Sequence, residues 1–226
     1  MKKKIVVLSG AGMSAESGIS TFRDAGGLWE NYDVMQVAHI DSWQTNRDLM
    51  LKFYNERRKQ LASVEPHEGH KIIAELEADF EVVVVTQNVD NLHERAGSSN
   101  VIHLHGELTK ACSSKDKECV VDIGYNEIHP GDQAADGSQL RPFIVWFGEA
   151  VPEIERAAFE VSQADILIIV GTSMQVYPAA GLIHYARRGI PIYLIDPAEV
   201  NVPARVEVIR KTAGAGLALL KEKLVP

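Results

Sequence analysis

The chain has 226 residues, of which 46% are hydrophobic and 24% charged, and its formal net charge is −8. This composition is ordinary for a soluble globular protein of one or two domains. The excess of 31 acidic over 23 basic residues argues against nucleic acid as a partner, and no apolar run approaches the roughly 20 residues of a membrane span. Two cysteines give no disulfide framework. We expect a cytoplasmic protein that binds neither nucleic acid nor membrane.

The first predicted strand, Lys4–Ser9, leads directly into the glycine-rich turn Gly10-Ala11-Gly12. Glycines allow a tight turn there and let a ligand approach the backbone closely. Residues 14–19 can open a helix whose free N–H groups point back at the turn. This arrangement suits a diphosphate and fits the G-x-G-x-x-A variant of the dinucleotide fingerprint. By itself the pattern is equally compatible with a turn that binds nothing.

Apolar runs with the near-continuous character of buried parallel strands recur along the chain. They are Ile5–Leu8, Val82–Thr86, Ile166–Val170 and Ile192–Ile195. Helical patterns occupy the intervals, at residues 46–63, 67–78, 152–164 and 178–187. The alternation predicts an α/β fold with a Rossmann-like parallel sheet and helices on both faces.

Two intervals interrupt this alternation. Residues 29–75 hold helical patterns but no buried strand, and residues 109–142 are polar and carry both cysteines, Cys112 and Cys119. We expect these two insertions to form a small lobe. The Rossmann-like domain would then consist of residues 1–28, 76–108 and 143–226.

An acidic residue that could hold a ribose is found late in the chain. A dehydrogenase of this fold carries one about 20 positions after the glycines, at the end of the second strand. Asp33 lies near that spacing, but residues 28–37 are not a convincing strand. Asp196, directly after the strand Ile192–Ile195, is the better candidate. Simple hydride transfer is therefore disfavoured, whereas the sequence remains compatible with a bound dinucleotide.

Polar side chains follow two other predicted strands. The run Thr86–His93 contains Gln87, Asn88 and Asp90, and Gly171-Thr172-Ser173 follows Ile166–Val170. Open α/β sheets bind ligands at these carboxyl ends. The alternative is that Asn88 and Asp90 merely cap the next helix.

Two histidines, His103 and His105, lie on the same face if the backbone is extended. We expect one to be structural and His105, next to Gly106, to be the better general base. The aromatic segment Val145–Glu149 is either core or an exposed backbone able to pair with a peptide.

Tyr54 and Arg57 are three residues apart on a predicted helix and therefore share a face. A guanidinium binds a carboxylate through two parallel hydrogen bonds, and a phenol can add a third. The alternative is a tyrosine at the edge of the core and an arginine paired with Glu56 or Glu65.

In their order and spacing these motifs resemble the sirtuin family of NAD-dependent protein lysine deacylases. The run from Gly10 to Arg23 resembles the family's first signature, and 86–93, 105–106, 145–149 and 171–178 resemble later ones. The resemblance spans nearly the whole chain. It implies that NAD is consumed as a co-substrate and that acylated proteins are the partners.

The resemblance also implies a set of site residues. Those implied for NAD binding are Gly10, Ala11, Gly12, Glu16, Phe22, Arg23, Trp29, Gln87, Asn88, Asp90, Gly171, Thr172, Ser173, Asp196 and Ala215. Those implied along the acyl-lysine peptide are Tyr54, Arg57, Val145, Phe147, Gly148, Glu149 and Val151. His105 would be the general base that activates a ribose hydroxyl, a task for neutral imidazole near neutral pH. Asn88 would be catalytic as well, because with Asp90 it offers oxygens to positive charge on the ribose.

The segment from Tyr54 to Arg57 resembles the Tyr-x-x-Arg motif of the sirtuin branch that removes malonyl and succinyl groups. We therefore expect malonyl- and succinyl-lysine, and acetyl-lysine as well, to be substrates. Protein ADP-ribosyl transfer on the same scaffold is one alternative. A non-catalytic NAD-sensing module and a plain dehydrogenase are the others.

The chain departs from the family's pattern at three points. Many sirtuins bind structural zinc with two cysteine pairs, but this chain offers only Cys112 and Cys119, so we expect a zinc-free small lobe. Ser20 stands where proline is usual, and Asp196 stands where asparagine is usual. A carboxylate can still accept hydrogen bonds from both ribose hydroxyls. Target proteins and oligomeric state do not follow from the sequence.

Overall fold

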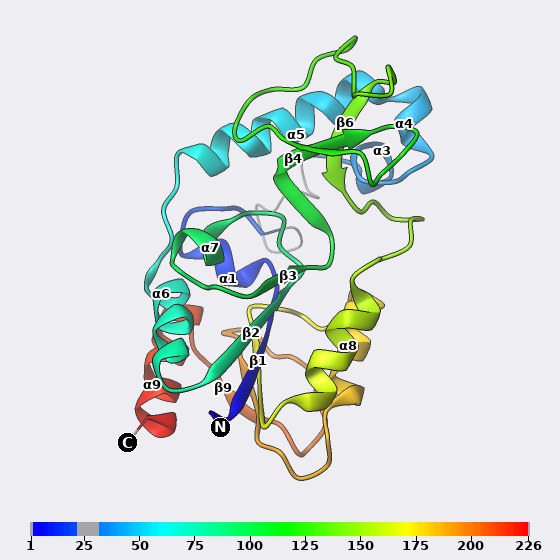
Figure 1. Ribbon diagram of the computed structural model, residues 1–226. Coiled ribbons are helices and arrows are strands. Elements are labelled where there is room, and N and C mark those ends of the chain that lie inside the picture. The colour runs from blue at the N-terminus through cyan, green and yellow to red at the C-terminus, as the bar shows by residue number, and fades with distance from the viewer. Residues whose placement is uncertain (1, 22–31, 226) are drawn as a thin grey trace.

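The computed structural model describes residues 2–21 and 32–225 (Figure 1). A six-stranded sheet with the order β3-β2-β1-β7-β8-β9 forms its centre, and every neighbouring pair in it is parallel. The order reverses between β1 and β7, and open α/β sheets bind ligands at such a switch point. The strands are β1 (Lys4–Ser9), β2 (Glu81–Thr86), β3 (Val101–His103), β7 (Ile166–Val170), β8 (Ile192–Ile195) and β9 (Glu207–Ile209).

Helices cover both faces of this sheet. Because side chains alternate along a strand, the even-numbered residues of β1 face one core and the odd-numbered residues face another. The first core includes residues of α8 (Ile154–Gln163) and of the 3-10 helix η2 (Ala179–Tyr185). The second includes residues of α6 (Glu68–Glu75) and α9 (Ala213–Leu224). Burial on both sides explains why these strands are apolar throughout.

A smaller lobe lies above the sheet in Figure 1. Its core contains tryptophans, a tyrosine and aliphatic residues from α3 to α5 and from β4 and β6. The antiparallel strand order is β5-β4-β6. Its elements are α3 (Val34–Val37), α4 (Ser42–Thr45), α5 (Arg47–Ala62), β4 (Gly106–Ser113), β5 (Val120–Asp122) and β6 (Leu140–Ile144). The polar insertion therefore contributes a sheet.

Some elements differ from the sequence-based expectation. The helix expected at 14–19 is the single turn α1 (Gly12–Ala15), and the chain leaves it through Gly18, whose φ of 91° favours glycine. The stretch 178–187 forms the short 3-10 helix η2. Helix α6, which the predicted boundary at residue 75 assigns to the small lobe, packs against α9 and the sheet.

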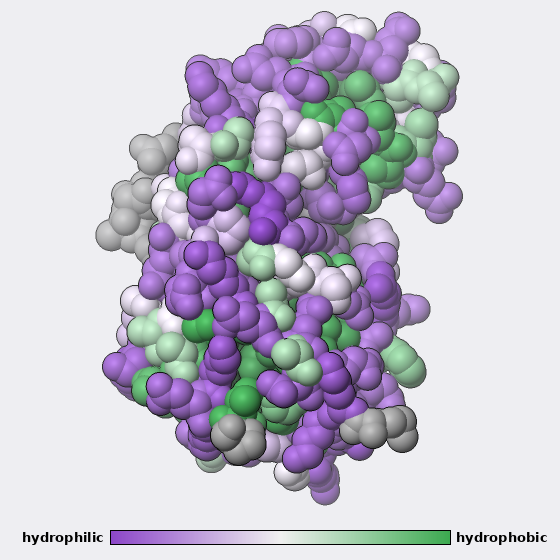
Figure 2. Space-filling view, turned by 60° about the vertical axis from the view of Figure 1, so that its left-hand side comes forward, coloured by the Kyte–Doolittle hydropathy of each residue, from purple (hydrophilic) through white to green (hydrophobic). Residues whose placement is uncertain are grey.

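The surface is largely polar. Figure 2 shows hydrophilic residues over most of one face, with hydrophobic residues gathered in patches. No helix within residues 2–21 and 32–225 combines the length and the apolar character needed to cross a membrane.

Candidate active site

Two loops dock against each other at the switch point of the sheet. The amide of Gly10 donates to the oxygen of Val170 at 3.1 Å, and the amide of Gly12 donates to the oxygen of Gly171 at 2.9 Å. A Cβ on Gly10 would lie 2.7 Å from Cβ of Thr172, and one on Gly12 would lie 2.8 Å from Cα of Gly171. The glycines are therefore needed for backbone to meet backbone here.

The glycine-rich turn has fewer free amides than expected. The amides of Met13 and Ser14 donate to the oxygens of Gly10 and Ala11, so with the bonds across the two loops most of this turn is already paired. Within the turn as the structure describes it, only the amide of Ala11 has no partner. The expected cradle of free N–H groups is reduced to this one amide, and the glycines serve mainly for close packing.

The loop after β2 is tied to α1 through Ser14. Asn88 Nδ2 donates to Ser14 Oγ at 3.0 Å, and Ser14 Oγ donates to Asp90 Oδ2 at 2.8 Å. Burial raises the pKa of Asp90, although hydrogen bonds from Ser14 and from the amide of Leu92 act in the opposite direction. The two predicted ribose-side residues thus meet through Ser14, a serine to which the sequence alone assigns no role.

Gln87 joins the two docked loops. Its backbone amide donates to the backbone oxygen of Ser9 at 2.9 Å, and its side-chain Nε2 donates to Thr172 Oγ1 at 3.2 Å. Thr172 is buried, whereas the neighbouring Ser173 is exposed. Two residues that the resemblance implies for NAD binding are therefore connected directly.

His105 has the hydrogen-bond pattern of a general base. Its Nδ1 lies 3.1 Å from the oxygen of Gln87. A carbonyl only accepts, so Nδ1 carries the proton and Nε2 keeps its lone pair. Burial lowers the pKa of His105, and the bond to Gln87 opposes this in part. The ring is thus neutral near neutral pH, as proton abstraction requires.

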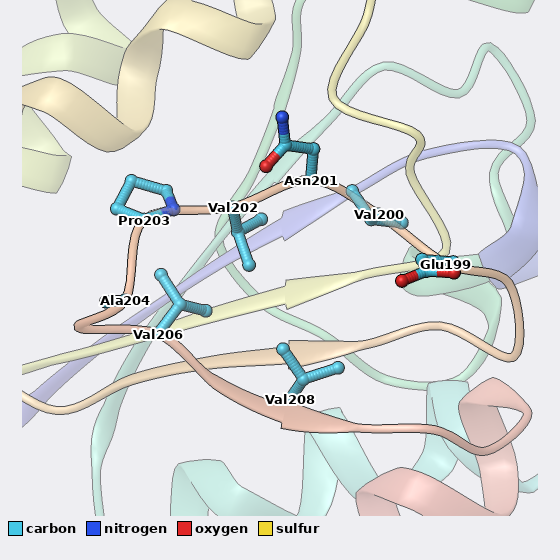
Figure 3. Close-up of a pocket in the computed structure, with 8 residues that line it drawn as sticks. All are labelled: Glu199, Val200, Asn201, Val202, Pro203, Ala204, Val206 and Val208. Carbon is cyan, nitrogen blue, oxygen red and sulfur yellow. The ribbon is translucent and has the colours of Figure 1, made fainter.

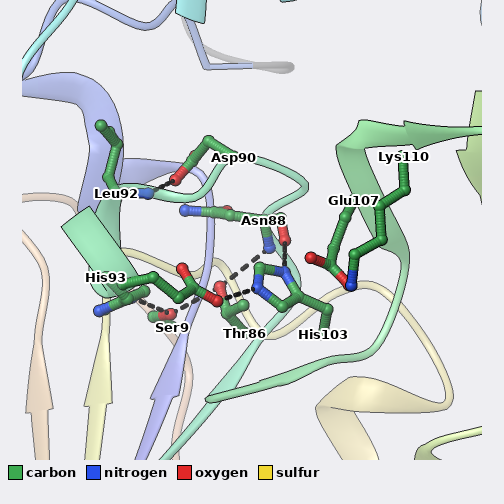
Figure 4. A network of polar contacts seen from close by, with 10 residues as sticks. Ser9, Thr86, Asn88, Asp90, Leu92, His93, His103, Glu107 and Lys110 are labelled. Carbon is green, nitrogen blue, oxygen red and sulfur yellow. Dashed lines mark hydrogen bonds and ion pairs between the residues drawn. The ribbon is translucent and has the colours of Figure 1, made fainter. Parts of the chain in front are cut away.

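The second histidine, His103, makes two polar contacts (Figure 4). Its Nδ1 lies 3.0 Å from the oxygen of Asn88, and its Nε2 lies 2.7 Å from Glu94 Oε1 on α7 (Leu92–Arg95). Burial alone would lower the pKa of His103, but the hydrogen bond and charge of Glu94 outweigh it, so the pKa is raised. The two histidines therefore have opposite protonation preferences.

Asp196 lies at the end of β8, where it was expected. The residue is 9% exposed, and its Oδ1 accepts a hydrogen bond from the amide of Ala198 at 2.9 Å. A pocket of about 530 Å³ follows along the next loop, lined by residues 199–204, 206 and 208 (Figure 3). Another, of about 410 Å³, lies between α5 and residues 127–130. Neither lining includes a predicted site residue.

Glu16 contacts the beginning of α9. Its carboxylate accepts hydrogen bonds from the amide of Gly214 at 2.8 Å and from Thr212 Oγ1 at 3.1 Å. Ala215, which the resemblance implies for NAD binding, is exposed in the same helical turn. Glu16 thus positions the segment that carries Ala215.

Tyr54 and Arg57 differ in how well their polar atoms are satisfied. Tyr54 is 5% exposed, and its hydroxyl oxygen accepts a hydrogen bond from Trp146 Nε1 at 2.9 Å. Arg57 is half-buried above the ring of Phe53, and no described residue pairs with its buried Nε. Burial lowers the pKa of Arg57. Trp146, which sequence reasoning left without a polar role, fixes the tyrosine hydroxyl.

The two carboxylates proposed as alternative partners of Arg57 are engaged elsewhere. Glu56 accepts a hydrogen bond from Tyr32 at 2.8 Å, and Glu65 pairs with Arg95 at 2.8 Å. No ion pair joins Arg57 to either one in the part of the chain that the structure describes. A half-buried, unpaired guanidinium is suited to an incoming anion.

Phe147 lies in an extended segment that is already paired within the chain. Its amide donates to the oxygen of Ala38 at 2.9 Å, and its oxygen accepts from the amide of Ile40 at 3.0 Å. Its side chain lies at the surface, 43% exposed, and the exposed Gly148 follows with a φ of 86°. Val145, two residues earlier, donates its amide to the oxygen of His105, which links this segment to the proposed base.

Glu149 and Val151 have structural partners. The Glu149 carboxylate pairs with Arg141 Nη1 at 2.9 Å and with Lys117 Nζ at 2.6 Å, and it accepts from the amide of Trp146 at 2.8 Å. Val151 packs against the core that α8 covers. The side chain of Glu149 is therefore committed to holding its own loop.

Three predicted cofactor residues, Phe22, Arg23 and Trp29, lie outside the described residues. Cys112 is buried in β4, and Cys119 is half-buried. In the ranges 2–21 and 32–225, no three His, Cys, Asp or Glu side chains are grouped so as to hold a metal ion.

Comparison with known proteins identifies close relatives. Residues 10–178 match the Sir2 family. An NAD-dependent protein deacylase of Bacteroides thetaiotaomicron is 58% identical over 99% of both chains. One of Helicobacter pylori is 52% identical over 99% of this chain and 98% of its own. A solved Sir2 homologue–NAD complex has a TM-score of 0.88 at 38% identity, covering 99% of this chain and 90% of that one.

Proposed function

This chain belongs to the Sir2 family, and we propose that it removes malonyl and succinyl groups, and acetyl groups as well, from lysine side chains of proteins. Its general activity, without regard to the acyl group, is that of an NAD-dependent protein deacylase with NAD as co-substrate. The preference for acidic acyl groups rests on one observation, the half-buried Arg57 whose Nε has no described partner.

The residues at the switch point fit a dinucleotide. The glycines at 10, 12 and 171 let the two loops dock backbone to backbone, where any Cβ would collide, and the amide of Ala11 is unpaired among described residues. Bound NAD supplies a ribose carbon that becomes reactive as nicotinamide departs. His105 Nε2 would take the proton of a ribose hydroxyl, because Nδ1 is committed to Gln87. Asn88, fixed by Ser14 through Nδ2, keeps its Oδ1 as an acceptor for the ribose.

The acyl preference follows from the hydrogen-bond capacity of Tyr54 and Arg57. Since Trp146 donates to the oxygen of Tyr54, the phenol proton is left to donate to an acyl carboxylate. Arg57 would contribute the opposite charge, at about 1.5–3 kcal/mol for a hydrogen bond to a charged group. An acetyl group would leave the guanidinium without a partner, and a succinyl or malonyl group would satisfy it.

Mass spectrometry of one peptide tests the proposed function. The peptide would carry acetyl-, malonyl- or succinyl-lysine and be incubated with and without NAD. We expect NAD-dependent loss of all three groups, fastest for succinyl and malonyl. Acetyl loss that outpaces both would contradict the preference. Label from NAD that stays on protein would favour ADP-ribosyl transfer instead.

Substitution of Arg57 separates the acyl groups. Arg57→Met should lower kcat/KM for desuccinylation by roughly 10- to 100-fold, as loss of a charged hydrogen bond predicts, and deacetylation much less. Tyr54→Phe should be the milder change. Lys59→Met, an exposed cation of the same helix, is the matched control and should alter neither rate. Equal losses of both activities in Arg57→Met would remove Arg57 from the acyl site.

A further inference from the structure

His103 is held at both ring nitrogens by groups that accept hydrogen bonds. Nδ1 faces the backbone oxygen of Asn88 at 3.0 Å, and Nε2 faces the carboxylate of Glu94 at 2.7 Å. The His103 side chain is only 8% exposed, so water competes little for either contact. Figure 4 shows the His103 ring with its dashed contact to Asn88.

Only one protonation state satisfies both contacts. A carbonyl has no proton to give, and the pKa of Glu94 is lowered because His103 outweighs the effect of burial, so its carboxylate is ionised. A neutral imidazole donates from one nitrogen only. Both contacts are therefore made as donors by an imidazolium.

The surrounding charges favour this state. Glu107 adds a second negative charge near His103 and is itself paired with Lys110 at 2.7 Å. His103 also acts to lower the pKa of the Asp90 carboxyl, although burial leaves that pKa raised. The neighbouring His93 is buried, and its pKa is lowered to about 4, so it brings no competing positive charge near neutral pH.

We propose that His103 is a positioning residue, whose two N–H groups join Glu94 to the backbone oxygen of Asn88 and so hold Asn88 where the ribose must lie. This rests on the proposed deacylase function, because Asn88 is assigned to the ribose there. The same histidine pair then divides two tasks, with His105 neutral and reactive and His103 charged and structural.

The division of tasks predicts a pH profile with two separate limbs. Activity should fall at acid pH as His105 gains a proton. It should fall at alkaline pH as His103 loses one, because the remaining N–H cannot serve Asn88 and Glu94 together. In Glu94→Gln the charge that favours the imidazolium is gone, so the alkaline limb should move to lower pH while the acid limb stays.

Three variants and one control test the proposal. His103→Leu removes both donors and should lower kcat about tenfold or more, since a misplaced reactive group is costly, and should also weaken NAD binding in calorimetry. His103→Asn keeps a neutral donor, so it should recover part of the activity without the alkaline limb. Glu94→Gln should shift that limb. Glu127→Gln loses the same charge in the small lobe, away from His103, and should match the wild type.

Nitrogen NMR of the ring, recorded without substrate, gives a readout that does not depend on turnover. Both ring nitrogens of His103 should be protonated at pH 7 in the wild type. The fraction of doubly protonated rings should be smaller in Glu94→Gln. A neutral His103 at pH 7 would overturn the proposal. So would a folded His103→Leu protein with the wild-type pH profile and NAD affinity.

If His103→Leu does not fold, the limb shift in Glu94→Gln decides the question. If the wild type turns over no acyl peptide, the proposed function fails. NAD affinity and the ring protonation then still decide the role of His103.

Discussion

The Nδ1 atoms of His103 and His105 meet consecutive carbonyls of the loop after β2, those of Asn88 and Gln87, at 3.0 and 3.1 Å. The two rings differ at Nε2. The Nε2 atom of His103 contacts Glu94, whereas the Nε2 atom of His105 has no described partner. The carboxylate of Glu94, with the charge of Glu107 added, thus separates a charged ring from a neutral one.

Removal of the His105 ring should abolish most of the activity. His105→Ala should lower kcat by roughly 10²–10⁴, the usual contribution of a general base, while NAD still binds. Nicotinamide release and calorimetric NAD affinity measure the two effects. Turnover near the wild-type rate would exclude His105 as the base.

Sequence reasoning could identify His105 as the better base, because Gly106 follows it and leaves room. It could not assign His103, since the partner Glu94 lies nine positions earlier on a different element. The assignment of His105 as base stays a prediction, which the geometry supports. Ser14 was missed because its link to Asn88 and Asp90 joins segments 74 and 76 residues apart.

Among the helices, α9 begins with an unusual cap. Its N-cap Thr212 makes no side-chain cap bond, and Glu16, far away in the sequence, supplies the acceptor for the amide of Gly214. A carboxylate at a helix N-terminus also interacts favourably with the helix dipole.

Glu16→Ala should therefore lower the free energy of unfolding by about 1 kcal/mol, the usual cost of losing a cap. Because Ala215 lies in the same turn, NAD affinity should fall too. Urea titration and calorimetry measure the two changes. Glu222→Ala, an exposed residue near the other end of α9, should not destabilise the protein. Equal effects of the two variants would argue against a capping role.

The strand β6 is held to the following loop by a buried ion pair. Arg141 and Glu149 are 3% and 7% exposed, and Arg141 also stacks on Trp146 at 3.4 Å from the ring centre. Glu149→Gln should lower the free energy of unfolding by about 3 kcal/mol, because it leaves a buried cation uncompensated.

Glu153→Gln breaks an exposed pair with Arg156 and should cost less than about 1 kcal/mol. Chemical denaturation compares the two variants. Similar midpoints would show that the buried pair contributes little.

Buried strands were the most predictable elements. The bounds expected for β7 and β8, Ile166–Val170 and Ile192–Ile195, are those of the structure, because both faces of each strand are covered. The sheet of the small lobe was not predicted. Its strand β5 is exposed at every residue and carries no hydrophobic alternation to reveal it.

Across the molecule, two fully buried histidines link stability to pH. The rings of His70 and His93 are 4.9 Å apart, and neither nitrogen of His70 has a described hydrogen-bond partner. Burial lowers the pKa of His70 to about 2 and that of His93 to about 4. Both rings are therefore neutral in the folded protein where an unfolded chain would already be protonated.

The free energy of unfolding should be highest above the unfolded pKa of about 6.5 and decrease as pH falls towards 4. Each histidine contributes a slope of roughly 1.4 kcal/mol per pH unit in that range. Urea unfolding at several pH values measures it. His70→Leu should reduce the slope by the contribution of one histidine, about 1.4 kcal/mol per pH unit. Substitution of the exposed His129 by Leu should leave the slope unchanged. An unchanged slope in His70→Leu would contradict the assignment.

The fold class and the family were predictable because motifs distant in sequence recur at the carboxyl ends of strands, which one parallel sheet brings together. The strand order, with its reversal between β1 and β7, places them at one edge. The lobe boundary at residue 75 and the cytoplasmic location stay predictions.

The docked loops of Gly10–Gly12 and Gly171–Thr172 have a consequence for association with a dinucleotide. Each loop already satisfies the other's backbone, so this part of the proposed NAD site is formed before the dinucleotide binds. The entropy cost of ordering the two loops is therefore met during folding and not during binding. This favours high affinity for the dinucleotide at low concentration. A methyl group added at Gly12 would push the two loops apart, and the binding of the dinucleotide would then carry the entropy cost of ordering them.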